Sequence, residues 1–213
     1  MLDYFERGAG DSATALMVWL HGLGADGYDL EPVAEMLGRP RVRHVFAHAP
    51  VRAVTINGGM AMRAWFDIAA SDLRWREDAE GIMGSARQVR DLVRNLHASS
   101  GLPVVLAGFS QGAVISLAAA AQGVPGLAGI VAMSGYVPQC LQPMLANLSG
   151  IPVLMAHGEQ DEVIPFALAR AGCDLLVQNA QPVDWHAYPM PHTICQQEIL
   201  DVSNWLSGLL ETA

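Results

Sequence analysis

Residues 103–121 read PVVLAGFSQGAVISLAAAA. An apolar run of strand character precedes the pentapeptide GFSQG, and an alanine-rich run of helical character follows it. The pattern Gly-x-Ser-x-Gly at a strand-to-helix junction is typical of a sharp turn that lifts a serine hydroxyl clear of a sheet. The stretch therefore predicts a strand over 104–107, a helix over 111–122 and a nucleophilic serine, Ser110, between them.

Apolar segments of strand character alternate with helical segments along the rest of the chain. The other predicted strands cover residues 16–20, 42–46, 127–133, 152–156 and 183–188, and the other predicted helices cover 77–97, 165–176 and 195–209. Near-continuous apolar strands that alternate with helices predict an α/β fold, a mostly parallel central sheet with helices on both faces. Ligand sites in such sheets gather at the carboxyl ends of the strands.

Composition predicts one compact unit. The 213 residues are 52% hydrophobic, and no Pro-, Gly- or Ser-rich linker and no internal repeat divides them. We therefore expect a single domain over residues 1–213. No segment resembles a secretion signal, and no run approaches the ~18 apolar residues of a membrane span. These features predict a cytoplasmic protein with no membrane span.

The charged and nucleophilic residue types exclude several functions. The net charge is −9, and residues 95–213 contain one arginine against eight acidic residues. This distribution argues against a nucleic acid or an anionic membrane as partner. The chain has no lysine, which excludes a Schiff-base lysine, a Ser-Lys dyad and a P-loop lysine. The three cysteines lie far apart without metal-ligand spacing, so we expect reduced thiols and no metal site.

A serine nucleophile needs a base, and the base needs an acid that holds its tautomer. His192 follows the last predicted strand in a rigid loop that begins PMP, which places it at the carboxyl edge of the sheet. Three acids follow the strand 152–156, namely Glu159, Asp161 and Glu162, and spacing alone gives Asp161 only a small advantage. The tetrahedral intermediate also needs two backbone N–H donors. We expect them from Gln111, directly after the serine, and from Leu23 in the glycine-rich loop 21–27.

Taken together, these motifs resemble the small carboxylesterases related to acyl-protein thioesterases and lysophospholipases, within the α/β-hydrolases. The resemblance rests on residues 21–27, 65–67, 108–113, 134–138, 157–165 and His192, and it spans nearly the whole chain. It implies an α/β-hydrolase fold and a triad of Ser110, His192 and Asp161, which resolves the choice of acid. It also implies that Leu23 and Gln111 are the oxyanion donors, and that no metal and no organic cofactor takes part.

Residues 57–65 (NGGMAMRAW) depart from the family pattern, because relatives often carry an aromatic residue and a proline there. We expect this segment to be the flap of the site and the residues that contact substrate to be Met60, Met62, Trp65 and Val163. Met side chains suit an adaptable apolar pocket. The alternative is that the apolar side chains of the flap belong to the core.

The expected activity is hydrolysis of carboxylic esters, with short to medium acyl chains, through an acyl-serine intermediate. Two other functions remain open: cleavage of acylated proteins or lysophospholipids by the same triad, and a catalytically silent fold that only binds. The expected partner is a small-molecule ester. The Trp and Met content is compatible with a homodimer surface and equally with core packing.

Overall fold

The computed structural model describes residues 2–10, 12–70 and 76–211. Its main sheet has seven strands in the order β1-β3-β2-β6-β7-β8-β9. The edge strand β1 runs antiparallel to β3, and every other neighbouring pair is parallel. The bounds of these strands are β1 Tyr4–Gly8, β2 Ala15–Leu20, β3 Val42–Ala47, β6 Val104–Phe109, β7 Leu127–Met133, β8 Val153–Gly158 and β9 Val183–Tyr188. The predicted mostly parallel sheet is confirmed.

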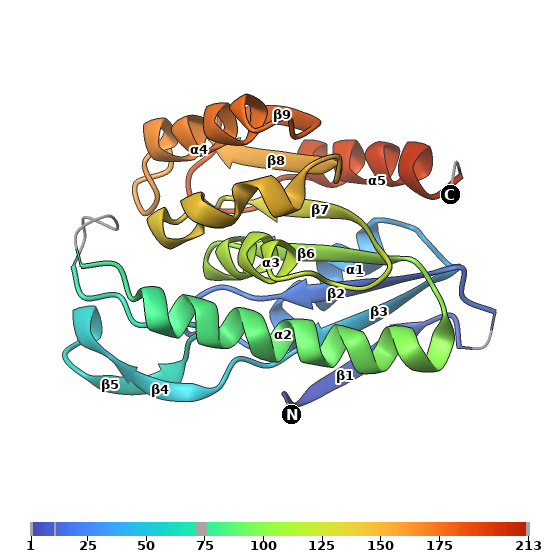
Figure 1. Ribbon diagram of the computed structural model, residues 1–213, viewed down its shortest axis with the longest axis horizontal. Helices are drawn as coiled ribbons and strands as arrows, with labels where there is room; N and C mark the ends of the chain where they lie inside the picture. The colour runs from blue at the N-terminus through green and yellow to red at the C-terminus, as the bar shows by residue number, and fades with distance from the viewer. Residues whose placement is uncertain (1, 11, 71–75, 212–213) are drawn as a thin grey trace.

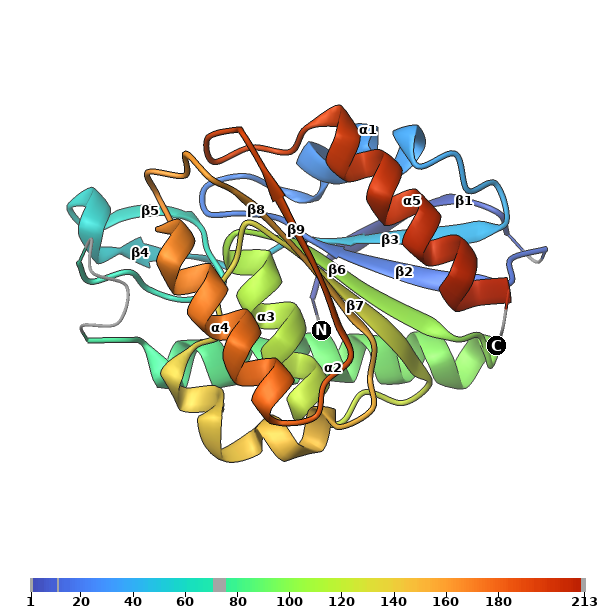
Figure 2. The same ribbon diagram turned by 90° about the horizontal axis from the view of Figure 1, so that it is seen from above.

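Helices cover both faces of this sheet (Figures 1 and 2). One face is covered by α2, α3 and α4, and the other by α1 and α5. Their bounds are α1 Glu31–Met36, α2 Ala79–Ser100, α3 Gln111–Ala121, α4 Phe166–Gln178 and α5 Gln196–Glu211. The connections within the described residues contain three 3-10 helices: η1 Gly27–Leu30, η2 Thr55–Asn57 and η3 Gln139–Leu148.

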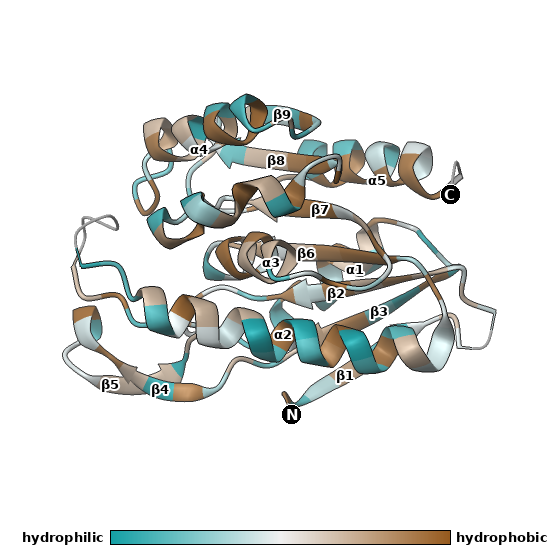
Figure 3. Ribbon diagram, in the orientation of Figure 1, coloured by the Kyte–Doolittle hydropathy of each residue, from teal (hydrophilic) through white to brown (hydrophobic). Residues whose placement is uncertain are grey.

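The pleat of the strands divides the apolar residues between two cores. In β2, Leu16, Val18 and Leu20 pack on the α2–α3 side, whereas Met17 and Trp19 pack on the α1–α5 side. Successive side chains of a strand point to opposite faces, so a strand buried on both faces is apolar throughout. Figure 3 shows this hydrophobic character along β2, β6 and β7.

Helix α2 is amphipathic, and local capping sets its ends. Its buried stripe includes Ile82, Val89 and Val93, and its hydrophilic residues face outward (Figure 3). The side chain of Asp78 accepts a hydrogen bond from Gly81 N, and Gly101, at φ +68°, ends the helix. The sequence predicted a helix over 77–97, which starts two residues early and ends three residues early. Both differences concern the ends of the helix, whose exact positions are set by the capping residues and not by the periodicity of the apolar residues.

Strands β1, β4 (Val51–Val54) and β5 (Met60–Arg63), helix α1 and the three described 3-10 helices were not predicted. Strand β1 lies at the sheet edge and is largely exposed, so it lacks an apolar run. Strands β4 and β5 form a separate antiparallel hairpin beside the main sheet (Figure 1). Of this hairpin, β5 lies within the segment 57–65 that was expected to be the flap, and β4 precedes that segment.

The register brings the carboxyl ends of the parallel strands to one edge. Leu20 pairs with Gly108, Phe109 with Met133, and Gly158 with Tyr188. The loops that follow these strands therefore emerge side by side, and they carry every candidate catalytic residue. Within the part of the chain that the structure describes, no helix is both long enough and apolar enough to cross a membrane.

Candidate active site

Ser110 occupies the turn between β6 and α3. Its backbone is left-handed, with φ +58°, a conformation that non-glycine residues adopt only where the surrounding structure enforces it. Two glycines make the turn sterically accessible. A Cβ atom on Gly108 would collide with the backbone of Gly112, and one on Gly112 would collide with the carbonyl of Leu20. The backbone N–H of Ser110 donates to Met133 O at 2.9 Å, which fixes the turn against β7.

Backbone contacts join the loop that carries His192 to the turn that carries Asp161. Glu159 N donates to Tyr188 O at 2.8 Å, and Gln160 N donates to Met190 O at 3.1 Å. Gly158 has no side chain at the point where the carbonyl of Met190 approaches it, and a Cβ atom there would overlap that carbonyl. These backbone contacts alone hold the two loops side by side, independently of any side-chain interaction.

The structure brings Ser110, His192 and Asp161 into one hydrogen-bonded row. His192 Nε2 lies 3.0 Å from Ser110 Oγ, and His192 Nδ1 lies 2.7 Å from Asp161 Oδ2. Because Asp161 offers an acceptor, Nδ1 carries the proton and Nε2 accepts from the serine hydroxyl. The competing acids, Glu159 and Glu162, are exposed.

The Asp161 carboxylate is buried and rigidly held. Its other oxygen, Oδ1, accepts hydrogen bonds from Val163 N at 2.9 Å and Ile164 N at 2.8 Å. The ring of Phe109 packs against that of His192, with centroids 4.8 Å apart. Asp161 and His192 therefore each have a second contact that limits the rotation of the side chain.

The loop after β2 lies directly beside Ser110. The ideal Cβ position of Gly22 is 3.4 Å from the Ser110 Cβ atom, so this glycine lets the loop approach the serine closely. Gly24 N is engaged with Arg63 O at 2.9 Å. Among the described residues, the backbone N–H groups of Leu23 and Gln111 donate to no acceptor. They are two free donors in the loop and the turn that flank the serine.

His21, which sequence reasoning did not single out, anchors this loop. Its Nδ1 lies 2.7 Å from Gly22 O, and its Nε2 accepts from Ala49 N at 3.0 Å. Burial lowers the pKa of His21, so the ring stays neutral, as this pair of partners requires. The signal in the sequence is the His-Gly pair at the start of the glycine-rich loop, since a buried histidine there can bond its own loop.

The side chain of Gln111 ties the nucleophile turn to the segment after β5. Its Oε1 accepts from Trp65 N at 3.0 Å, and its Nε2 donates to Phe66 O at 2.9 Å. Trp65 is fully buried, and its indole Nε1 donates to His21 O at 2.8 Å. This geometry favours a structural role for Trp65, which links neighbouring loops by buried hydrogen bonds, over contact with substrate.

The other residues expected to contact substrate are more accessible. Met60 is 64% exposed and Val163 is 56% exposed. Met62 is half-buried, and its sulfur accepts from Asn57 Nδ2 at 3.2 Å. A shallow cavity of about 550 Å³ opens beside the glycine-rich loop and is lined by Gly24, Ala25, Asp26, Tyr28, Asp29 and Arg63.

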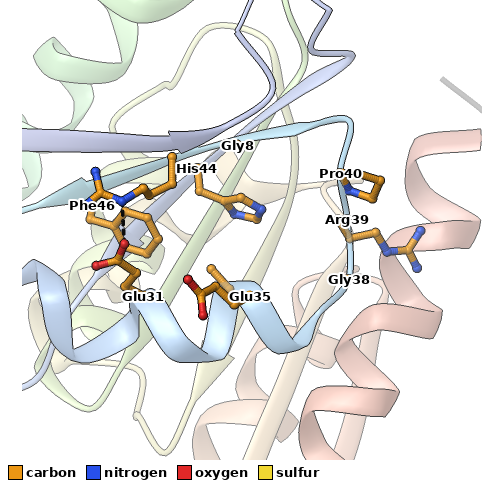
Figure 4. A pocket seen from close by; sticks show the side chains of 10 residues that line it. Gly8, Glu31, Glu35, Gly38, Arg39, Pro40, His44 and Phe46 are labelled. Atoms are coloured by element: carbon orange, nitrogen blue, oxygen red, sulfur yellow. Dashed lines mark hydrogen bonds and ion pairs between the residues drawn. The ribbon is translucent and has the colours of Figure 1, made fainter.

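A second cavity, of about 420 Å³, lies between α1 and β3, and none of the candidate catalytic residues lines it (Figure 4). Three of its charged side chains have partners within the protein: Arg7 pairs with Glu31 at 2.5 Å, and Arg39 reaches α5 and donates to Ser203 and Ser207. Among the residues that the structure describes, no group of three or more His, Cys, Asp or Glu side chains is arranged to hold a metal ion.

Comparison with known sequences identifies the family. The sequence profile of the phospholipase/carboxylesterase family matches residues 7–210. The chain belongs to the phospholipase/carboxylesterase family. It is 36% identical to acyl-protein thioesterase 1 of Cryptococcus neoformans over 226 aligned positions, which cover 94% of each protein.

Solved structures agree with this membership. The chain is similar to acyl-protein thioesterase 2 of Zea mays, with a TM-score of 0.87, 29% identity and coverage of 99% of this chain and 100% of that one. It is also similar to esterase PE8, with a TM-score of 0.80, 27% identity and coverage of 98% and 99%. The expected α/β-hydrolase fold is confirmed, and the protein is a serine hydrolase of the phospholipase/carboxylesterase family.

Proposed function

We propose that this protein is a serine carboxylesterase that cleaves carboxylic esters through an acyl intermediate on Ser110. The observation that carries the proposal is the unbroken row from Ser110 Oγ through His192 to Asp161, with separations of 3.0 and 2.7 Å. A serine hydroxyl is a weak nucleophile at neutral pH and becomes effective when an adjacent base takes its proton.

Acylation uses each member of the row. Ser110 Oγ attacks the carbonyl carbon of the ester, while His192 Nε2 takes the hydroxyl proton. Asp161 holds the Nδ1–H tautomer of His192 and stabilises the imidazolium that forms. The intermediate collapses when His192 gives its proton to the leaving alcohol, which departs and leaves Ser110 acylated.

The negative charge that develops on the carbonyl oxygen is stabilised by the free N–H groups of Leu23 and Gln111. Such preorganised donors are worth about 10²–10³ in rate each. Gln111 is also the first residue of α3, so the positive end of the helix dipole faces the same oxygen. In deacylation, His192 takes a proton from water, the hydroxide attacks the acyl carbon, and Ser110 Oγ leaves with the proton that His192 returns.

Substrate contact is proposed for Met60, Met62 and Val163, which are accessible, with Trp65 behind them as support. Apolar, flexible side chains suit a short to medium acyl chain. A second candidate activity is hydrolysis of acylated proteins, because the relatives that match nearly the whole chain are named acyl-protein thioesterases. A lysophospholipid substrate would use the same acyl-serine chemistry.

The test is turnover of a p-nitrophenyl ester series from acetate to palmitate by the wild-type protein and by Ser110→Ala. We expect the variant to fold and to lose activity. The chain length that the wild type hydrolyses fastest then indicates how long an acyl chain the site accommodates. Retained turnover in Ser110→Ala would contradict the assignment. Comparing kcat/KM for a short ester, a long acyl thioester and a lysophospholipid then separates the candidate substrates. Folded wild-type protein that neither turns over any of them nor reacts with a fluorophosphonate would favour the silent fold.

A further inference from the structure

A second histidine contacts the acid of the proposed triad. His157 lies near the end of β8, and its side chain is 1% exposed. Its Nε2 lies 2.9 Å from the carbonyl oxygen of Ile164 and 3.3 Å from Asp161 Oδ2. Both neighbours are acceptors, so Nε2 carries the ring proton and donates to Ile164 O, with the positive end of the N–H dipole beside the carboxylate.

This contact closes the turn that presents Asp161. Ile164 accepts from His157 through its carbonyl and donates through its own N–H to Asp161 Oδ1 at 2.8 Å. Asp161 Oδ2 in turn lies between two histidine nitrogens, His192 Nδ1 at 2.7 Å and His157 Nε2 at 3.3 Å. His157 therefore contributes to the position of the carboxylate that faces His192 and to the electrostatic field at its Oδ2 atom.

The surroundings of His157 keep it neutral. Its ring stacks on Trp185, with centroids 6.5 Å apart and planes 13° apart, and the ring of Phe166 packs edge-on, with centroids 6.2 Å apart. Burial lowers the pKa of His157, the charge of Asp161 raises it, and that of protonated His192 lowers it. The guanidinium of Arg170 lies over the Trp185 ring at 5.4 Å. A neutral ring supplies a dipole without cancelling the charge of Asp161.

The other ring nitrogen shows that the histidine is not explained by packing. Among the described residues, His157 Nδ1 is buried and has no hydrogen-bond partner. A buried acceptor without a donor is unfavourable, and a phenyl ring would fill an aromatic sandwich without that penalty. The contacts of Nε2 with Ile164 and Asp161 therefore compensate for the cost of the unpaired Nδ1.

We propose that His157 is a positioning residue for the hydrolytic reaction: it locks the 158–164 turn and tunes the Asp161 carboxylate that orients His192. The inference rests on the proposed triad. It is separate from the three residues of the triad, because His157 touches neither the substrate nor the reacting atoms.

The test compares His157→Phe, which keeps an aromatic ring and removes the donor, with His157→Gln, which restores an N–H group. His44→Phe is the matched control, because His44 is also a buried histidine and lies in β3, outside the site. Losing one hydrogen bond predicts a fall in kcat on the order of tenfold in His157→Phe, with KM unchanged. The acid limb of the kcat/KM profile moves to higher pH, because the carboxylate without its neighbouring dipole holds a proton on His192 more strongly. His157→Gln recovers part of both effects.

Each active site is counted by fluorophosphonate titration, so a fraction of unfolded protein does not mimic the effect. An unchanged kcat per site and an unchanged acid limb in folded His157→Phe would overturn the proposal, as would equal changes in His44→Phe. If His157→Phe does not fold, the low-field proton resonance of His192 Nδ1–H decides, and it must shift between wild type and His157→Gln. This resonance needs no substrate. Wild-type protein that lacks esterase activity contradicts the proposed function, whereas an unshifted resonance contradicts the role of His157.

Discussion

Replacing Trp65 with phenylalanine tests whether this side chain stabilises the structure through its buried hydrogen bonds or contacts the substrate. The change keeps an aromatic ring but removes the indole N–H that donates to His21 O at 2.8 Å. A buried carbonyl left without a donor costs about 1–3 kcal/mol. The indole also has two more carbon atoms than the phenyl ring, and at roughly 0.8 kcal/mol for each methylene-sized group their loss adds about 1–2 kcal/mol. The free energy of unfolding should therefore fall by about 2–5 kcal/mol, a large part of the ~5–15 kcal/mol typical of a domain.

The assay combines urea denaturation with the p-nitrophenyl ester series. Trp19→Phe is the matched control, because Trp19 is equally buried and its Nε1 donates to His44 Nδ1 at 3.0 Å, in the core on the α1–α5 side. Both variants should lose similar stability. Only Trp65→Phe should lower kcat per active site, because Trp65, unlike Trp19, bonds the loop that carries the proposed Leu23 donor. The preferred acyl chain length should be unchanged in both.

Either of two results would refute this reasoning. If Trp65→Phe keeps the wild-type stability but shifts the best chain length, the indole faces the acyl group and the structural role is wrong. If Trp19→Phe also lowers kcat per site, the loss reflects general loosening of the protein and not the loop.

Three further variants test other parts of the structure. Asp161→Asn should lower kcat by about 10⁴, because an amide N–H that faces His192 fixes the wrong tautomer, and kcat per titrated site measures it. Gly112→Ala should fold poorly, because its Cβ would collide with the carbonyl of Leu20; Gly84→Ala in α2, where the new Cβ would meet only Arg87 at 3.8 Å, should fold normally, as thermal unfolding of both will show. Burial raises the pKa of Glu198 from 4.5 to about 8, so the folded state holds a proton that the unfolded state releases, and wild-type stability should fall as pH rises from 4.5 to 8. Glu198→Gln should remove this dependence in urea denaturation, and a slope equal to that of the wild type would contradict the buried neutral carboxyl.

The sequence was sufficient to predict the sheet and two members of the row. Continuous apolar runs such as Leu127–Met133 have one stable environment, a strand buried on both faces. The glycines around Ser110 and the rigid loop before His192 follow strands, and parallel strands bring their carboxyl ends together. Asp161 needed the family resemblance, because three acids share its loop and only long-range contacts separate a buried carboxylate from two exposed ones.

Other features could not be predicted because they depend on contacts between distant segments. The sequence pattern around an apolar residue such as Trp65 is the same whether the side chain lines a substrate pocket or packs in the core. Only the hydrogen bonds of Trp65 to His21 and Gln111 distinguish these two environments. Strand β1 lies at the edge of the sheet with β3 as its one neighbour, so it is largely exposed and carries polar residues. His157 sits in an apolar strand pattern, and nothing in that pattern indicates that its ring turns toward Asp161.

The two sides of the candidate site are built in the same way. On the oxyanion side, Gln111 and Trp65 bond backbone groups of the neighbouring loops. On the acid side, His157 bonds the backbone of Ile164, which bonds Asp161. These supports are buried, and a buried polar group must keep its partner, so they leave little freedom for substitution. Met60 and Val163 are exposed, so changing them removes little buried area. Under the proposed contact of these exposed residues with substrate, selectivity for the acyl chain can vary without disturbing the supports on which the geometry of Ser110 and His192 depends.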